Sequence, residues 1–157
     1  MCLSKITKRY GRNNNTEFEG FQVKRITYDV NGKARYAPLF IHGSKKVNAP
    51  LRFTRYVAHK SKKRVYTEDE NKTYIPGFHL FKTFEDANWL YQCKAKGFSR
   101  SKRLQLCICK VKARGKIVSG TQFENQKAIV AREIKVVEVI KKYEEPKYEN
   151  KKRICKQ

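Results

Sequence analysis

The sequence predicts an α+β fold: a single small domain in which a curved antiparallel sheet of about five or six strands packs against one main helix. Several segments alternate apolar and polar residues with the period of two that is typical of half-buried strands. Residues 84–95 instead carry apolar residues at helical spacing. Of the 157 residues, 39% are hydrophobic and 12% are aromatic, which is enough for one small core.

A hairpin is predicted near the start of this domain. Apolar and polar residues alternate over residues 21–30, and Asn31 and Gly32 follow directly. Asn-Gly is a strong hairpin signal because both residues tolerate positive φ. We therefore expect residues 34–41 to form the returning strand, and we expect Pro38 to restrict that strand to a sheet edge or a bulge.

The middle of the domain predicts a short strand that leads into the helix. The strand covers residues 78–81. Thr83, with Asp86 three residues later, resembles a capping box, although Glu is the usual partner at the second position. The helix then covers residues 84–95, and Gly97 is a plausible stop signal.

Further strands are predicted toward the end of the domain. Residues 104–109 alternate as a strand does, and residues 114–116 (Arg-Gly-Lys) predict a turn of a hairpin. Gly120 is expected to end the strand that follows this turn. Residues 128–140 are rich in β-branched residues, which favours a strand, although the spacing of Glu and Lys would also allow a helix.

Both ends of the chain are predicted to be basic and flexible. Residues 1–17 form a basic N-terminal arm, residues 18–140 form the single α+β domain, and residues 141–157 form a basic C-terminal tail. The tail has many Lys residues and few apolar ones, so we expect it to be extended or disordered.

The cysteines and the hydropathy indicate a soluble intracellular protein. Five Cys are an odd number without framework spacing, so free thiols are expected, and Cys107 and Cys109 are expected to be small core residues. No apolar run is long enough to span a bilayer, and the N-terminus lacks the apolar stretch of a signal peptide. We expect no membrane partner, no cofactor and no metal.

The charge of the chain predicts its partner class. Thirty-seven Lys and Arg stand against 14 Asp and Glu, giving a formal net charge of +23. Such an excess repels itself in a compact fold and suits a polyanion, of which nucleic acid is the commonest. The binding residues we predict are the clustered cations of two basic stretches: Lys60, Lys62, Lys63, Arg64, Arg100, Lys102, Arg103, Lys112, Arg114 and Lys116.

Aromatic residues among these cations favour RNA or a ribonucleoprotein as the partner. Phe53, Tyr56 and Tyr66 would stack on unpaired bases while Lys and Arg follow the phosphates. The alternative is that the aromatic residues are core and the cations solvate one face. The second stretch, residues 100–116, would present Lys110 and Lys112 on one face of a hairpin, although an ordinary exposed strand face has the same pattern.

Two segments also suggest an enzyme. The strand-like residues 40–44 contain His42 followed by Gly and Ser, and residues 77–81 contain His79 ahead of a helix with a small residue and aromatic residues. This arrangement resembles the ADP-ribosyltransferase superfamily. The resemblance implies that NAD is the cofactor, that His42 holds the nicotinamide ribose, that His79 packs on the nicotinamide, and that Glu124 or Glu133 is the acidic residue. Position 79 has His where Tyr is usual in that superfamily.

A broader resemblance covers more of the chain. Residues 76–81 (PGFHLF), 85–87 (EDA) and 130–134 (VAREI) resemble small uncharacterised phage and prophage proteins. The resemblance implies a phage-encoded protein that acts on a host assembly, in the cytoplasm of the host cell or in the virion. It implies no activity. A third function class is therefore a virion or inhibitor protein that binds an acidic or nucleic-acid-binding protein surface.

Overall fold

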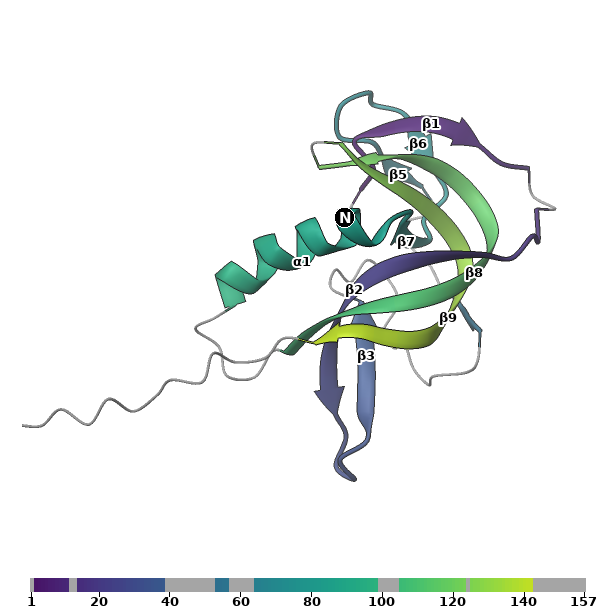
Figure 1. Ribbon diagram of the computed structural model, residues 1–157. Helices are drawn as coiled ribbons and strands as arrows, with labels where there is room; N and C mark the ends of the chain where they lie inside the picture. Colours follow the sequence, from purple (N-terminus) through teal and green to yellow (C-terminus); the bar gives the residue numbers. More distant parts are fainter. Residues whose placement is uncertain are drawn as a thin grey trace, which may run out of the picture.

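The computed structural model describes residues 2–11, 14–38, 53–56, 64–98, 105–123 and 125–142. They form a strand-dominated α+β fold with one helix (Figure 1). The elements are, in chain order, β1 (Lys5–Arg9), β2 (Phe18–Tyr28), β3 (Ala34–Pro38), β4 (Thr54–Arg55), β5 (Val65–Tyr66), β6 (Thr73–Tyr74), β7 (Phe78–Phe81), α1 (Phe84–Phe98), β8 (Gln105–Gln122) and β9 (Gln126–Lys142).

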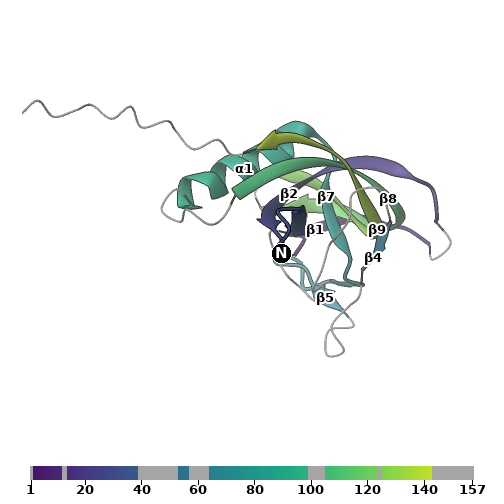
Figure 2. The same ribbon diagram turned by 90° about the horizontal axis from the view of Figure 1, so that it is seen from below.

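The main sheet curves far enough for its strands to meet in a ring. It is antiparallel and has seven strands, more than the sequence predicts. β8 pairs with both β2 and β9, β9 also pairs with β7, and β7 meets β2 at Phe21 and Phe81. These pairings close the ring, and Figure 2 shows the curvature of the sheet from a second direction. Outside the ring, β1 pairs with β8, β3 with β2, and β4 with the middle of β9.

The predicted hairpin and its edge strand are confirmed. The carboxylate of Asp29 accepts hydrogen bonds from the backbone N–H groups of Asn31 and Lys33 at 3.0 and 2.9 Å, which fixes the turn between β2 and β3. β3 pairs with β2 alone among the described strands, so Pro38 lies on an edge, as expected. The hairpin projects from the rest of the sheet (Figure 1).

The predicted turn at residues 114–116 is wrong, and so is the strand end at Gly120. β8 is one continuous strand from Gln105 to Gln122. Gly115 has a φ of 70°, and the register with β9 shifts just after it, between Lys116 and Val118. The glycine therefore bends the strand without ending it. Gly120 has another role. A Cβ at this position would collide with the carbonyl oxygen of Lys5, so the lack of a Cβ lets β1 approach β8.

The helix is confirmed. It is longer than expected, since it continues past the predicted stop at Gly97 and ends at Phe98. The hydroxyl of Thr83 accepts a hydrogen bond from the N–H of Asp86 at 3.2 Å, which caps the first turn. The second half of a capping box is absent among the described contacts. The carboxylate of Asp86 accepts the N–H of Lys127 instead, at 3.3 Å, and so ties the helix to β9.

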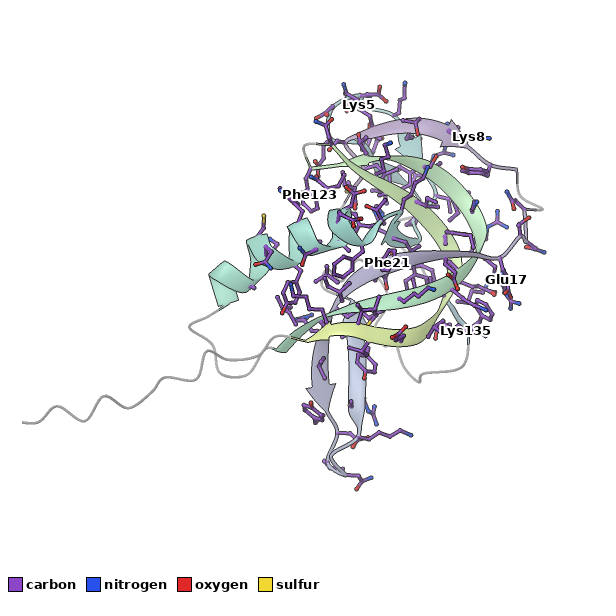
Figure 3. The ribbon with its side chains drawn as sticks, viewed as in Figure 1. Lys5, Lys8, Glu17, Phe21, Phe123 and Lys135 are labelled. Atoms are coloured by element: carbon purple, nitrogen blue, oxygen red, sulfur yellow. The ribbon has the colours of Figure 1, made fainter. Side chains whose placement is uncertain are left out.

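Apolar side chains pack in three clusters around the ring. One lies between α1 and the strands and includes Leu90, Tyr91 and Ile108. The second includes the thiols Cys107 and Cys109, which are buried and outside any disulfide, as predicted. The third gathers where β1 and the β5–β6 pair meet the far half of β8. Phe21 packs edge-on against Phe84 of the helix (Figure 3).

The termini differ in part from the expected arms. Residues Lys5–Arg9, which the sequence places in the N-terminal arm, form β1 and pair with residues Val118–Thr121 of β8. At the other end β9 continues to Lys142, past the expected domain boundary, and residues 143–157 lie outside the described residues. Within the described part of the chain, no helix combines the length and apolar character needed to cross a membrane.

Candidate nucleic-acid interface

Four of the ten predicted binding cations lie in the described part of the chain: Arg64, Lys112, Arg114 and Lys116. The other six lie outside the described residues: Lys60, Lys62, Lys63, Arg100, Lys102 and Arg103. His42 and Glu124, which belong to the enzyme hypothesis, also lie outside them. The described residues still carry roughly half of the +23 charge. The geometry of the site is therefore built on Lys112, Arg114, Lys116 and their neighbours.

The cations of β8 continue a face that begins under the helix. Leu106 and Ile108 point toward α1 and are buried. Beyond the helix, Lys110, Lys112 and Arg114 follow on the same face of the strand, since side chains alternate with a period of two. Val111 and Ala113 point the other way into the core and are fully buried. The expected separation of Lys110 and Lys112 from Val111 and Ala113 is thus confirmed.

Two lysines face each other across the β8–β9 pair. Lys112 is directly opposite Lys135 in the register. Glu19 lies opposite Lys112 on the other side, in β2, but its carboxylate pairs with Lys110 at 2.7 Å. That hydrogen bond holds the pKa of Glu19 below its usual range. No acidic side chain among the described residues is within ion-pair distance of Lys112 or Lys135. Like charges directly opposite each other destabilise a sheet.

An aromatic ring lies beside these lysines. The guanidinium of Arg114 lies 4.3 Å from the centre of the Phe53 ring, and the ammonium of Lys135 lies 5.0 Å from it. Phe53 is half-buried and comes just before β4, which pairs with β9. Both distances are within the range of cation–π attraction. Phe53 therefore forms, with Arg114 and Lys135, a mixed cationic and aromatic surface.

A polar depression of about 390 Å³ adjoins this surface. Its lining includes three arginines, Arg55, Arg114 and Arg132, with Glu17 and Glu133 among them. Glu133 contacts the Nε of Arg114 and lies 3.9 Å from the Nε of Arg55. Glu17 and Lys135 mark this side of the molecule in Figure 3, away from α1. The lining carries more positive than negative groups, which suits an anionic group such as a phosphate.

Lys116 extends the basic surface toward β1. Its ammonium lies 4.6 Å from the ring centre of Phe18 and 5.7 Å from that of Tyr10. Lys8 of β1 lies 5.3 Å from the same Tyr10 ring. Cations thus alternate with aromatic rings from Lys135 to Lys8. We call this surface, made of Lys8, Tyr10, Phe18, Phe53, Lys112, Arg114, Lys116 and Lys135, the basic face.

Part of the basic face has no clear signal in the sequence, and one predicted cation lies away from it. Lys135 belongs to a strand recognised by its apolar residues, while Tyr10 and Phe18 fall in the predicted arm and at the start of the predicted domain. Arg64 lies instead on the β5–β6 pair, where its Nε donates to the hydroxyl of Thr73 at 2.9 Å. Tyr66 is exposed there, while Tyr56 packs edge-on against Phe78 in the core.

The residues of the enzyme hypothesis lie in two different surroundings. His79 is held within a hydrogen-bond network: Gln122 meets its Nδ1 at 2.6 Å, and the hydroxyl of Tyr74 lies 3.3 Å from its Nε2. The same hydroxyl accepts the backbone N–H of Leu3 at 3.0 Å. Glu133 instead lines the polar depression with the arginines, and none of the described residues that line it is a histidine.

The described residues contain no group of three or more His, Cys, Asp or Glu side chains placed to hold a metal ion. No protein-family model, no curated protein and no solved structure matches this chain.

Proposed function

We propose that the protein binds nucleic acid, with RNA favoured, through the basic face, and that it acts without catalysis. The observation that carries the proposal is the opposed pair of Lys112 and Lys135. Neither is within ion-pair distance of an acidic side chain among the described residues, since Glu19, opposite Lys112 in β2, pairs with Lys110. Their repulsion weakens the sheet, and a bound phosphate would relieve it. Such a pair is better explained by an anionic partner than by folding.

The aromatic rings of the basic face favour unpaired bases. Phe53, Phe18 and Tyr10 each lie beside a cation, so a strand whose phosphates meet the lysines would bring its bases close to the rings. Stacking on aromatic rings accepts any base and requires that the base be unpaired. Sequence-specific RNA recognition also uses mostly single strands, because side chains cannot read the deep, narrow major groove of double-stranded RNA. The proposed ligand is therefore single-stranded RNA.

The phage resemblance supplies the setting of this proposal. A phage-encoded protein of this kind would act in the host cytoplasm or in the virion, on host RNA or on a ribonucleoprotein. The competing target is an acidic protein surface, and a binding experiment distinguishes the two.

The experiment compares two charge-matched double variants. Lys112→Glu/Lys135→Glu reverses the opposed pair, and Lys33→Glu/Lys82→Glu reverses two exposed lysines outside the basic face. Binding to a fluorescein-labelled single-stranded RNA is measured by anisotropy over a series of salt concentrations. We expect the first variant to bind at least about tenfold more weakly than the second. The slope of log K against log salt should fall by about 0.7 for each phosphate that the variant no longer neutralises.

Equal losses of affinity in the two variants would show that net charge alone causes the binding, and would contradict a role for the basic face. Capture of a host protein that survives nuclease treatment, without RNA binding at low salt, would favour the acidic-protein target instead.

A further inference from the structure

A lysine lies inside the core on the inner face of β2. Lys24 is fully buried, and its ammonium nitrogen has no hydrogen-bond partner among the described residues. An isolated buried charge is strongly unfavourable unless a counter-charge lies nearby. The position therefore calls for a negatively charged neighbour.

The neighbours of Lys24 are two thiols. Cys107 is directly opposite Lys24 in the β2–β8 register, and Cys109 lies two residues further on the same face. Their sulfur atoms are 3.5 Å apart, and neither residue is exposed. The thiol of Cys107 also lies 3.7 Å from the backbone carbonyl oxygen of Lys24. The thiols and the ammonium thus form one buried cluster.

Tyr36 covers part of this cluster. It lies on the edge strand β3, is only partly buried, and packs against the group of core residues that contains both thiols.

We propose that Cys107 and Cys109 bind one Cu(I) ion as a pair of thiolates, with the ammonium of Lys24 as the counter-charge. Two Cu–S bonds form, any thiol protons still present leave to solvent, and copper remains Cu(I). Two thiolates, one Cu(I) and one ammonium add up to a neutral group, which is what a buried site requires. Thiolates are the soft ligands that Cu(I) prefers.

The same cluster is unsuited to zinc. A structural Zn²⁺ site has four ligands in a tetrahedron, and most of them are Cys or His. Among the described residues no third His, Cys, Asp or Glu side chain joins the two thiols in a metal-binding group. Two thiolates, a divalent ion and the ammonium would also leave a net positive charge in the core.

The test uses a variant in which the other three cysteines, Cys2, Cys93 and Cys155, are replaced by Ser, so that the pair is the sole source of thiols. This reduced protein is titrated anaerobically with Cu(I) buffered by bicinchoninate. We expect one equivalent of Cu(I) to be withdrawn from the dye, and X-ray absorption should show sulfur ligands alone. Excess Zn²⁺ should not displace the copper.

Two further substitutions in the same background separate the roles. Cys107→Ser should abolish binding. Lys24→Met keeps both thiols, removes the counter-charge, and should weaken binding about 10- to 100-fold, as expected for a group next to a metal ligand. In the unmutated protein, the buried pair is alkylated only through unfolding, so the reaction is run in urea near the unfolding midpoint. Cu(I) should slow the alkylation of Cys107 and Cys109 there, measured by mass spectrometry, and should leave exposed Cys93 reactive.

Several results would overturn the proposal. They are failure of the folded three-serine variant to take up one equivalent of Cu(I), equal affinity in the Cys107→Ser variant, tighter binding of Zn²⁺, and alkylation of the pair at an unchanged rate in the presence of Cu(I). An unchanged affinity in Lys24→Met would overturn the role of the ammonium. The alkylation measurement needs no variant, so it decides the question even if Cys107→Ser does not fold.

Discussion

Single residues of β2, β8 and β9 place charge where it opposes folding. Lys112 faces Lys135 on the outer surface, and Lys24 lies without a hydrogen-bond partner among the described residues in the core. Each arrangement raises the free energy of the folded chain, by repulsion in one case and by loss of hydration in the other. Each is therefore a position where the ligand we propose would stabilise the protein: an anion at the outer surface and a cation held by thiolates in the core.

One substitution should raise the stability of the protein and weaken its binding to RNA. Lys135→Glu places a carboxylate opposite Lys112 and replaces a repulsive pair by an attractive one. We expect the free energy of unfolding to rise by about 0.2–1 kcal/mol, measured by urea denaturation, while RNA affinity falls. Lys33→Glu, at the exposed β2–β3 turn, is the control. A loss of stability in Lys135→Glu would show that the opposed lysines are not strained.

Tyr74 should make stability fall at high pH. Burial raises the pKa of its hydroxyl far above the usual value near 10. Above pH 10 the unfolded state loses this proton while the native state keeps it, so the free energy of unfolding decreases as pH rises. This contribution is fully present below pH 10 and decreases by at most about 1.4 kcal/mol per pH unit.

Tyr74→Phe tests this expectation by urea denaturation from pH 7 to 11. The variant should be less stable at pH 7 by about 1–3 kcal/mol, because the N–H of Leu3 loses its acceptor. Its decline above pH 10 should be shallower than that of the unmutated protein. Tyr66→Phe, at an exposed position, should leave the decline unchanged. Parallel curves for Tyr74→Phe and the unmutated protein would contradict the assignment.

At the level of elements, the two long strands determine where everything else lies. Along the first half of β8, one face packs against buried core residues and the other face packs against the helix. The far end of β8 pairs with β1. β1 attaches there because Gly120 leaves room for the backbone of Lys5. The attachment in turn brings Lys8 and Tyr10 beside Lys116, so the basic face depends on this backbone contact.

Gly120→Ala should therefore detach β1. The added methyl group would overlap the carbonyl oxygen of Lys5, and we expect a loss of about 1–3 kcal/mol in the free energy of unfolding. Backbone amides of β1 should also exchange faster with deuterium. Gly11→Ala is the matched control, because no atom of the described residues beyond its chain neighbours lies within 4 Å of its added Cβ. Equal stability of the two variants would show that β1 does not pack as described.

At the level of the whole molecule, the net charge of +23 opposes compaction everywhere. Ion pairs with side chains that are mostly exposed offset little of it, since such pairs contribute about 0–1 kcal/mol each. Burial in the three apolar clusters has to outweigh this repulsion. A polyanion, or salt, would reduce the same repulsion.

Salt should therefore stabilise the fold while it weakens RNA binding. We expect the melting temperature, measured by differential scanning calorimetry, to rise between 20 and 200 mM NaCl as the Debye length shortens to less than about 10 Å. An uncharged osmolyte at equal osmolality is the control. A melting temperature that falls with added NaCl would mean that ion pairs contribute more than repulsion.

Local patterns predict some elements of this protein and miss others, since no pattern predicted β1, β4, β5 or β6 as strands. The Asn31-Gly32 turn, the alternation along β2 and the helical spacing after Thr83 are each decided by residues close in sequence, and each is confirmed. The predictions around Gly115 and Gly120 are wrong because a glycine in the sequence is equally compatible with a turn, a bend or a close approach of two backbones. Which of these occurs depends on the neighbouring strands.

The sequence alone determined the partner class we propose, through its cation excess, and the kinds and order of most described elements, through their periodicity. The tertiary structure decided which side chains meet: that Lys112 faces Lys135, that Phe53 lies between Arg114 and Lys135, and that Lys24 lies opposite Cys107. These contacts join residues far apart in the chain. Their register follows from the burial of whole strand faces and the closure of the ring, which no short window of sequence contains.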